Sequence, residues 1–351
     1  VEILCKKIMI KWKYTMEEKK EMFPHLFNSL SIVIPVLSST FASVGRFLKH
    51  AGNMSLGMLI IDESGQAVPQ SALGAIYRTR RAVVVGDPLQ VEPVVTIPKV
   101  LIDILADSTC VANEYKVIEN SAQTFADNIN EFNGMIGERQ VGCPLVVHRR
   151  CIEPMFSISN LISYDNRMFN KTNKKEEYLK PENPFLIKKS GWINVEGVEN
   201  GGKDHFVKNQ AERVCQLMED AVHIYSDLFE TDDKIFIITP FRTVAESMRK
   251  FIISYFSAKG YDKEILLKWT KNCVGTVHTF QGKDANEVLL VLGCSNKSAG
   301  AMNWVVKKAN ILNVACTRAK YRIAFIGNIN DWKNRSCFRE FIPNLIDIIN
   351  V

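Results

Sequence analysis

The sequence predicts an α/β protein whose parallel sheets are covered by helices. Short apolar runs alternate with amphipathic stretches along most of the chain, and this alternation is typical of buried parallel strands joined by helices. The 351 residues suit about two domains of roughly 150 residues each. Several apolar runs end directly in acidic or polar residues, and α/β proteins bind ligands at the carboxyl ends of their strands. We therefore expect two α/β domains with a site at the sheet edge.

Three apolar runs predict buried strands in the first domain. They occupy residues 31–37, 58–62 and 82–86. Three glycines and a proline cluster at residues 134–144, and such a cluster indicates a break between regular segments. We therefore assign residues 1–140 to the first domain and residues 141–351 to the second.

The second domain has its own set of predicted strands and helices. Apolar residues recur at steps of three and four in two stretches, which indicates amphipathic helices at residues 207–221 and 244–255. Two polar segments, residues 171–180 and 199–203, are expected to be solvated loops. The predicted strands are residues 235–239, 273–277, 288–293 and 322–327.

The composition narrows the class of protein. Apolar residues make up 46% of the chain, and no apolar run approaches the ~20 residues that span a bilayer, so we expect no membrane partner. The net charge of +6 is compatible with a nucleic-acid partner and equally with ordinary surface lysines. The nine cysteines are scattered without zinc-type spacing, which favours a reduced, cytoplasmic protein. The start at Val1 resembles neither a signal peptide nor an initiating Met, so we expect a piece of a longer chain.

Two neighbouring strand ends carry the most informative polar residues. The apolar run 59–61 ends in Asp62-Glu63, and two carboxylates at such a crevice are costly unless they meet a cation. The next run ends in Gly86-Asp87-Pro88-Leu89-Gln90, where Gly86 permits a tight turn. The neutral amide of Gln90 can bond both a water molecule and a phosphate oxygen.

Five motifs in a fixed order resemble those of the superfamily 1 helicases, in the branch of the nonsense-decay RNA helicase and its DNA relatives. Residues 145–168 also look like a bacterial subgroup of AAA-domain helicases. The resemblance implies two RecA-like P-loop NTPase domains, the first incomplete, with ATP hydrolysed in the cleft between them. The motifs read LIIDE at 59–63, VVGDPLQ at 84–90, HRRC at 148–151, GTVHTFQGK at 275–283 and NVACTRAK at 313–320.

The resemblance also implies roles for individual residues. Asp62 would hold Mg²⁺ through water beside the ATP phosphates, and Glu63 would polarise the attacking water. Gln90 would sense the γ-phosphate, while Arg150 and Arg318 would reach it with guanidinium groups that fit phosphate oxygens. The further nucleotide contacts would be Asp87, Gln281, Gly282 and Lys283. The contacts to the nucleic-acid strand would be Ser38, Ser39, Thr40, Phe241, Arg242 and Thr276, although Phe241 could equally be a core residue.

One family element is missing from the sequence. No G-x-x-x-x-G-K-[ST] phosphate loop occurs in the chain, so we expect these 351 residues to lack ATPase activity by themselves. The sequence therefore predicts part of an ATP-dependent helicase that moves along single-stranded DNA or RNA. The alternative is a non-catalytic nucleic-acid-binding or regulatory module derived from a helicase. The residues leave open the choice of DNA or RNA, the polarity, the pathway and the oligomeric state.

Overall fold

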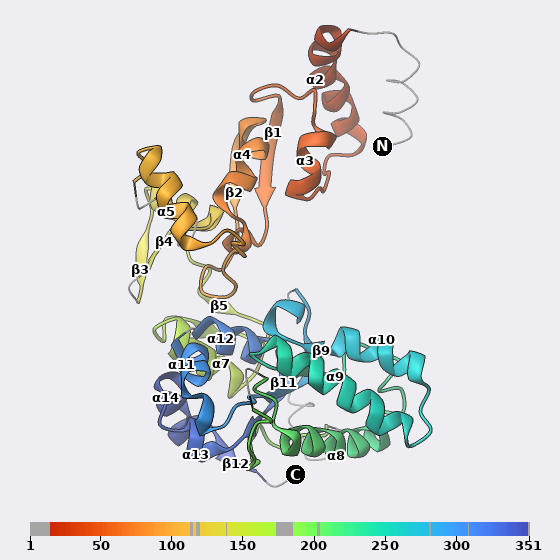
Figure 1. The fold of residues 1–351 in the computed structure, drawn as a ribbon. Coiled ribbons are helices and arrows are strands. Elements are labelled where there is room, and N and C mark those ends of the chain that lie inside the picture. The colour runs from red at the N-terminus through yellow and green to blue at the C-terminus, as the bar shows by residue number, and fades with distance from the viewer. Residues whose placement is uncertain are drawn as a thin grey trace. The chain divides into compact units, whose positions relative to one another are not determined.

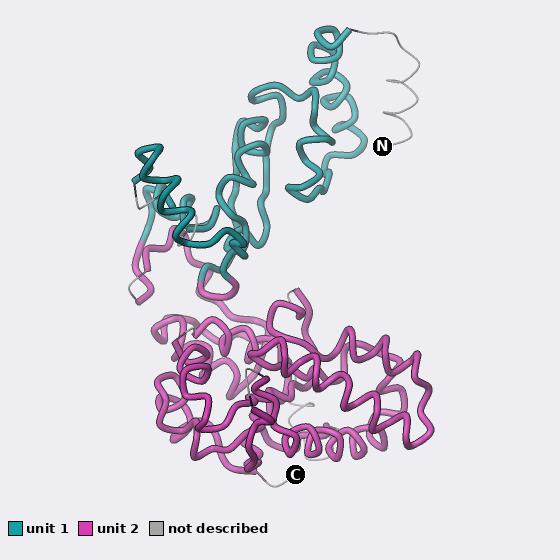
Figure 2. The backbone as a smooth tube through the Cα atoms, in the orientation of Figure 1, with its two compact units in different colours: residues 1–88, 92–133 teal, residues 89–91, 134–351 magenta. Residues whose placement is uncertain are grey.

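The computed structural model describes residues 15–112, 115–116, 120–137, 139–172, 185–201, 204–280, 282–307 and 309–349. The chain divides into two compact units, which Figure 2 shows in different colours. Unit 1 comprises Val1–Pro88 and Glu92–Asn133, and unit 2 comprises Leu89–Val91 and Gly134–Val351. The short segment Leu89–Val91 therefore belongs to the second unit although it directly follows Pro88 of the first.

Unit 1 contains a parallel pair of strands with helices around it (Figure 1). The pair is formed by β1 (Leu56–Ile61) and β2 (Thr79–Val84), and Ile61 lies opposite Val84. Two apolar residues of β1, Met58 and Ile60, are 58% and 66% exposed, so the predicted strand is present but half of it is not buried. The helices are α2 (Met16–Val33), α3 (Phe41–Phe47), α4 (Pro69–Tyr77), α5 (Lys99–Ser108) and α6 (Ala122–Ile129).

The predicted strand at residues 31–37 is wrong. Residues 31–33 finish α2, and residues 34–40 have irregular backbone. The helix begins at a capping box, in which the Thr15 hydroxyl accepts the Glu18 N–H and the Glu18 carboxylate accepts the Thr15 N–H. Phe23 and Phe27, four residues apart, bury one face of this helix. A short apolar run fits the end of such a helix as well as it fits a strand.

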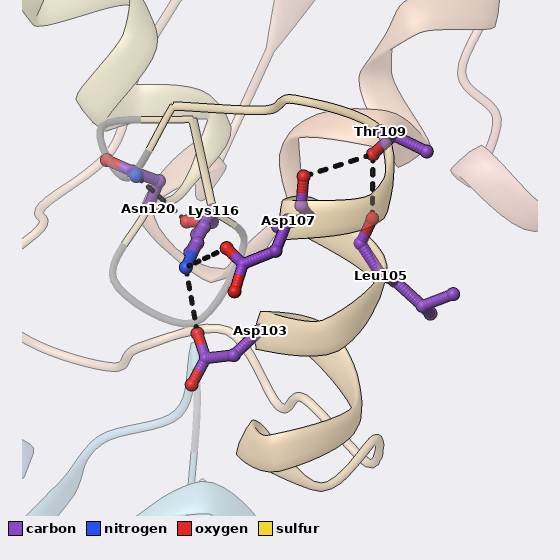
Figure 3. A network of polar contacts seen from close by, with 7 residues as sticks. Asp103, Leu105, Asp107, Thr109, Lys116 and Asn120 are labelled. Carbon is purple, nitrogen blue, oxygen red and sulfur yellow. Dashed lines mark hydrogen bonds and ion pairs between the residues drawn. The ribbon is translucent and has the colours of Figure 1, made fainter.

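A small polar network closes the end of α5 (Figure 3). The Lys116 Nζ lies 3.0 Å from an Asp103 carboxylate oxygen and 3.7 Å from one of Asp107, and both acids belong to α5. The hydrogen bond to Asp103 is the main reason why the pKa of Lys116 lies above its ordinary value. The Lys116 carbonyl in turn accepts the Asn120 side-chain amide at 2.9 Å. The network thus links α5 to the segment that leads into α6.

Unit 2 is built on a six-stranded parallel sheet in the order β12-β7-β11-β10-β8-β9. Four of these strands confirm the strands predicted for the second domain: β8, β9, β10 and β11. The bounds are β7 (Gly191–Asn194), β8 (Ile235–Ile238), β9 (Val274–Gly275), β10 (Ala285–Val291), β11 (Ala319–Gly327) and β12 (Asp347–Ile348). Short strand pairs join β3 (Gly134–Ile136) to β4 (Arg139–Val141) and β5 (Val147–His148) to β6 (Phe169–Asn170).

The helices of unit 2 form two packed groups (Figure 1). One group joins α8 (Lys208–Ile224), α9 (Arg242–Ser257) and α10 (Lys263–Cys273), and α8 and α9 confirm both predicted amphipathic helices. The other group joins α7 (Met155–Ser163), α12 (Ala309–Arg318) and α14 (Ser336–Leu345). The further helices are α11 (Ala299–Lys307) and α13 (Ile329–Trp332). Within the described parts of the chain, no helix combines the length and hydropathy that crossing a bilayer requires.

A buried carboxylate connects the sheet of unit 2 to its surroundings. Glu287 of β10 is fully buried and accepts the N–H groups of Leu186 and Ile187 at 2.9 and 2.7 Å. The Tyr225 hydroxyl donates to the same carboxylate at 2.7 Å. Burial raises the pKa of Glu287, and these donors together with the Arg322 guanidinium act against that rise. Because removing the carboxylate would leave several buried donors unpaired, Glu287 is a structural anchor of this core.

Candidate functional site

The acidic pair and the Gly-Asp turn of unit 1 follow neighbouring parallel strands. Asp62 and Glu63 come directly after β1, and Gly86-Asp87 come shortly after β2. The ladder continues past both strands, because the Val85 N–H donates to the Ile61 carbonyl at 2.8 Å and the Ser64 N–H donates to the Val85 carbonyl at 3.0 Å. The structure thus brings the two predicted segments to the same sheet edge, as expected for parallel strands.

Two glycines allow these turns to touch. A Cβ atom at Gly86 would lie 2.7 Å from the Gly65 nitrogen and 2.7 Å from the Ser64 hydroxyl oxygen. A Cβ atom at Gly65 would lie 2.8 Å from the Asp87 carbonyl oxygen. Such separations are too short for any side chain, so both positions require glycine for close backbone approach. Ser64 is buried, and its hydroxyl also lies 2.5 Å from the Gln123 side-chain oxygen, which fixes the turn against α6.

Both carboxylates of the acidic pair are exposed, and each has a local hydrogen bond. An Asp62 oxygen accepts the Glu63 N–H at 2.9 Å, and a Glu63 oxygen accepts the Gln66 side-chain amide at 2.8 Å. Glu63 has a φ of +53°, an uncommon conformation for a residue other than glycine that is found disproportionately at functional sites. Exposed carboxylate oxygens at a strand end are the ligands that a hard cation such as Mg²⁺ prefers.

In unit 2 the structure brings together Gln90, Arg318 and the loop that contains Gly282 and Lys283. An Arg318 Nη donates to the Gln90 side-chain oxygen at 3.2 Å, and the other Nη donates to the Lys283 carbonyl at 3.1 Å. Arg318 is the last residue of α12 and is only 3% exposed. Its guanidinium therefore donates hydrogen bonds to neutral oxygens of two other predicted motifs. Gln281, which we also predicted to contact nucleotide, lies outside the described residues.

Asn313 was not predicted as a site residue, yet it holds this arrangement in place. Its side-chain amide donates to the Leu89 carbonyl and to the Tyr164 hydroxyl, both at 3.0 Å. Its side-chain oxygen accepts the Ser159 hydroxyl at 2.5 Å. Asn313 is fully buried and thereby fixes the segment that carries Gln90. The available signal was a polar residue at an apolar position of an otherwise buried helix.

The segment of Arg150 is anchored beside the strand that follows Arg318. Arg150 itself is exposed, whereas the next residue, Cys151, is fully buried. The His148 Nε2 accepts the Cys151 N–H at 2.9 Å, and the Ile152 N–H donates to the Lys320 carbonyl at 3.3 Å. An exposed guanidinium on a well-anchored turn is free to contact an anion.

The predicted strand-contacting residues have different environments in the structure. Ser38, Ser39 and Thr40 are exposed in unit 1, but they lie in the irregular stretch before α3 and not after a strand. In unit 2, Arg242 begins α9 with its side chain 90% exposed and its Nε 2.9 Å from a Glu246 oxygen. Thr276 is half-buried between β9 and the following turn of 3₁₀ helix.

Of the two roles left open for Phe241, strand contact or core residue, its position favours the core. Phe241 is 8% exposed and belongs to the main core of unit 2. Its ring packs against those of His205 and Trp304, with centroids 4.8 and 6.0 Å away. Trp304 of α11 is itself 46% exposed, so it is the aromatic ring of this group that a base could reach. A single aromatic in an amphipathic helix gives no sequence signal for such a role.

Comparisons with known proteins agree with the resemblance to helicases. Two family models, both described as an AAA domain, match residues 3–97 and residues 131–330. The chain is 22% identical to mouse probable helicase senataxin over 90% of its length and 23% identical to an uncharacterized ATP-dependent helicase of Methanocaldococcus jannaschii over 95%. It is 24% identical to the DNA replication ATP-dependent helicase/nuclease DNA2 of Xenopus laevis over 98% of its length.

The chain spans only part of each of these relatives. It covers 11% of senataxin, 44% of the Methanocaldococcus jannaschii helicase and 30% of the Xenopus laevis protein. The AAA-domain match to residues 131–330 alone spans more than half of this chain. The match includes Arg150, Phe241, Arg242, Arg318 and all of the loop at 275–283, and thus every predicted site residue of unit 2 apart from Gln90.

Proposed function

The chain belongs to the AAA-domain helicases of superfamily 1, in the Upf1-like branch, and we propose that it is part of a protein that couples ATP hydrolysis to movement along single-stranded DNA or RNA. The observation that carries this proposal is the contact of Gln90, Arg318 and the Lys283 carbonyl, since three separate motifs meet at one guanidinium. An arginine placed there can donate to a phosphate oxygen. Because Gln90 is hydrogen-bonded to the same guanidinium, movement of the guanidinium toward phosphate would also move the Gln90 side chain.

The nucleotide end of the proposal assigns ATP and Mg²⁺ to the strand-end residues. Asp62 offers an exposed carboxylate at a sheet edge, which fits a hard, oxygen-preferring cation, so Asp62 is the residue that would hold Mg²⁺ through water. When bound, Mg²⁺ neutralises negative charge on the phosphates. Glu63, oriented by Gln66, would polarise the attacking water. The remaining proposed nucleotide contacts are Asp87, Arg150, Gln281, Gly282 and Lys283.

The nucleic-acid end of the proposal centres on Arg242 and Trp304 in unit 2. A single strand offers phosphates to a cation and exposed base faces to an aromatic ring. Arg242 is 90% exposed in its side chain and Trp304 is 46% exposed, and both lie next to or against Phe241. Ser38, Ser39, Thr40 and Thr276 are further proposed contacts through hydroxyl groups. The net charge of +6 is compatible with such a partner.

A binding experiment tests the proposal directly. Anisotropy titrations of the 351-residue chain with labelled homopolymers of DNA and RNA should show binding that tolerates sequence and prefers single strands. The affinity should fall steeply with salt, because bound strands release counterions from their phosphates. Salt-insensitive binding, or a strong preference for one duplex sequence, would contradict a strand-tracking surface and favour the regulatory-module alternative.

An ATPase measurement tests the catalytic roles separately. We expect negligible turnover by these 351 residues, since no stretch of the sequence matches the phosphate loop that cradles the β- and γ-phosphates. Strong turnover that persists unchanged in Glu63→Gln would refute the role assigned to Glu63.

A cytoplasmic location is also part of the proposal and rests on the scattered spacing of the cysteines.

A further inference from the structure

Three side chains with different ligand atoms meet in unit 2, and none of them is among the residues assigned to nucleotide. They are Glu199, His205 and Cys294, whose ligand atoms all lie within 4.8 Å of one another. The His205 Nδ1 and a Glu199 carboxylate oxygen are already 3.3 Å apart. The sequence predicted a solvated loop at residues 199–203, but the Glu199 side chain is only 2% exposed. A buried carboxylate is costly unless it meets a cation or several donors.

The backbone around the cluster is held in an unusual conformation. His205 and Cys294 both have positive φ values, of +57° and +56°, which is uncommon for residues other than glycine. The Cys294 N–H donates to the His205 carbonyl at 2.8 Å, so the two chain segments are fastened together directly below the side chains. A Cβ atom at Gly293 would lie 2.7 Å from the same carbonyl oxygen, so only glycine fits there. Non-glycine residues in this region cluster at functional sites and ligand clamps.

The Glu199 carboxylate is oriented by hydroxyl groups on its other oxygen. The Ser298 hydroxyl donates to Oε1 at 2.6 Å, and the Ser295 hydroxyl lies 3.4 Å from the same atom. The Oε2 atom is thereby left to face His205. Ligands of protein metal sites are typically oriented by hydrogen bonds of this kind from a surrounding set of residues.

We propose that Glu199, His205 and Cys294 form a zinc-binding site. Zinc is bound in proteins by thiolate, imidazole and carboxylate ligands, whereas Mg²⁺ and Ca²⁺ avoid sulfur. With bonds of about 2.0–2.3 Å, two ligand atoms on a tetrahedral zinc ion lie about 3.3–3.7 Å apart. The separation of 3.3 Å between His205 and Glu199 already matches this geometry, and the thiolate has to approach by no more than about 1.5 Å.

The charges of the proposed site balance without further residues. A thiolate, a carboxylate and a neutral imidazole together offset the two positive charges of the ion, and the thiol proton leaves to solvent when zinc binds. Three protein ligands leave a fourth position for water, which the half-buried His205 side can admit. The ion would fasten the segment after β7 to the end of β10 and support the ring of Phe241, which packs on His205.

Cobalt titration of the chelator-treated chain is the direct test, because Co²⁺ substitutes for zinc and reports thiolate ligation by absorption. We expect one equivalent of Co²⁺ to give a thiolate-to-cobalt charge-transfer band, and one equivalent of Zn²⁺ to abolish it. Cys294→Ser should lose the band, and Glu199→Gln and His205→Asn should weaken binding strongly; asparagine tolerates the positive φ of His205. Ser298→Ala should weaken binding about 10- to 100-fold through misorientation of Glu199.

The matched control is Cys110→Ser, which removes an exposed thiol from unit 1 and should leave the band unchanged. The titration of the unsubstituted chain needs no variant to fold, and circular dichroism establishes whether each variant keeps its secondary structure. The absence of any thiolate-to-cobalt band at micromolar metal would overturn the proposal. A band that survives both Cys294→Ser and Glu199→Gln would also overturn it, since the metal would then lie elsewhere.

Discussion

Replacement of Trp304 by alanine should weaken single-strand binding about 5- to 30-fold and leave its salt dependence unchanged. Stacking of one base on an aromatic ring contributes about 1–3 kcal/mol. Trp304 is 46% exposed, so neighbouring residues already cover part of the ring, and the lower part of that range, about 1–2 kcal/mol, applies. At about 1.4 kcal/mol for each factor of ten, this gives the expected change in Kd.

The assay is anisotropy with a labelled homopolymer at several salt concentrations between about 50 and 200 mM, the range in which phosphate contacts are resolved. Trp304→Phe should retain most of the affinity because it keeps a ring. Arg242→Ala should behave in the opposite way and lower the salt slope by roughly 0.7, as expected for the loss of one contact to a single strand. The melting temperature of Trp304→Ala should change little because the side chain is half exposed. Unchanged affinity in Trp304→Ala, with the fold intact, would refute the stacking role.

Three further predictions concern the framework of the two units. Asn313→Ala should lower the free energy of unfolding by about 2–4 kcal/mol, since the Leu89 carbonyl, the Tyr164 hydroxyl and the Ser159 hydroxyl each lose a buried partner. Urea denaturation measures this change. An effect no larger than that of Asn310→Ala on the same helix would contradict the prediction. Gly86→Ala should destabilise unit 1 by about 1–3 kcal/mol, because its Cβ would clash with Gly65 and Ser64. The control Gly45→Ala, whose Cβ meets nothing within 4 Å, should be neutral or slightly stabilising. Hydrogen exchange at residues 61–66 measures the difference, and equal exchange in both variants would argue against the close approach. Glu287→Ala should lower the free energy of unfolding by about 3 kcal/mol or more, because two backbone N–H groups and the Tyr225 hydroxyl are left unpaired. Thermal unfolding measures the loss. A stability equal to that of the unsubstituted chain would show that water replaces the carboxylate.

The predicted elements of unit 2 agree with the structure because their patterns were long or strongly apolar. The strand β8 is buried at every residue and β10 and β11 are mostly buried, while α8 repeats its apolar residues over several turns, so burial and periodicity point to one answer. The run at residues 31–37 is short, and the capping box at Thr15 and the paired Phe23 and Phe27 decided its helical start. The local pattern failed there because residues 31–33 continue a helix that begins fifteen residues earlier, at Met16.

The candidate site shows the same division between local and distant information. That Asp62-Glu63 and Gly86-Asp87 share a sheet edge follows from strand order alone, because parallel strands present their carboxyl ends together. That Phe241 is a core residue while Trp304 is accessible could not follow, because both are isolated aromatics in amphipathic surroundings. Exposure of a single ring depends on what packs against it.

The sequence by itself determined the order of motifs, the parallel α/β architecture and the set of groups proposed to contact phosphate, because these depend on residue type and spacing. Only the tertiary structure decided that Leu89–Val91 packs with unit 2, that Gln90 meets Arg318, and that Asn313 donates to the Leu89 carbonyl beside Gln90. It also decided that Glu199, His205 and Cys294 converge. Most of these contacts join residues far apart in the chain, and packing of the core places the segments side by side. A local pattern of residues cannot predict these contacts, because each contact depends on which distant segment the fold places beside it.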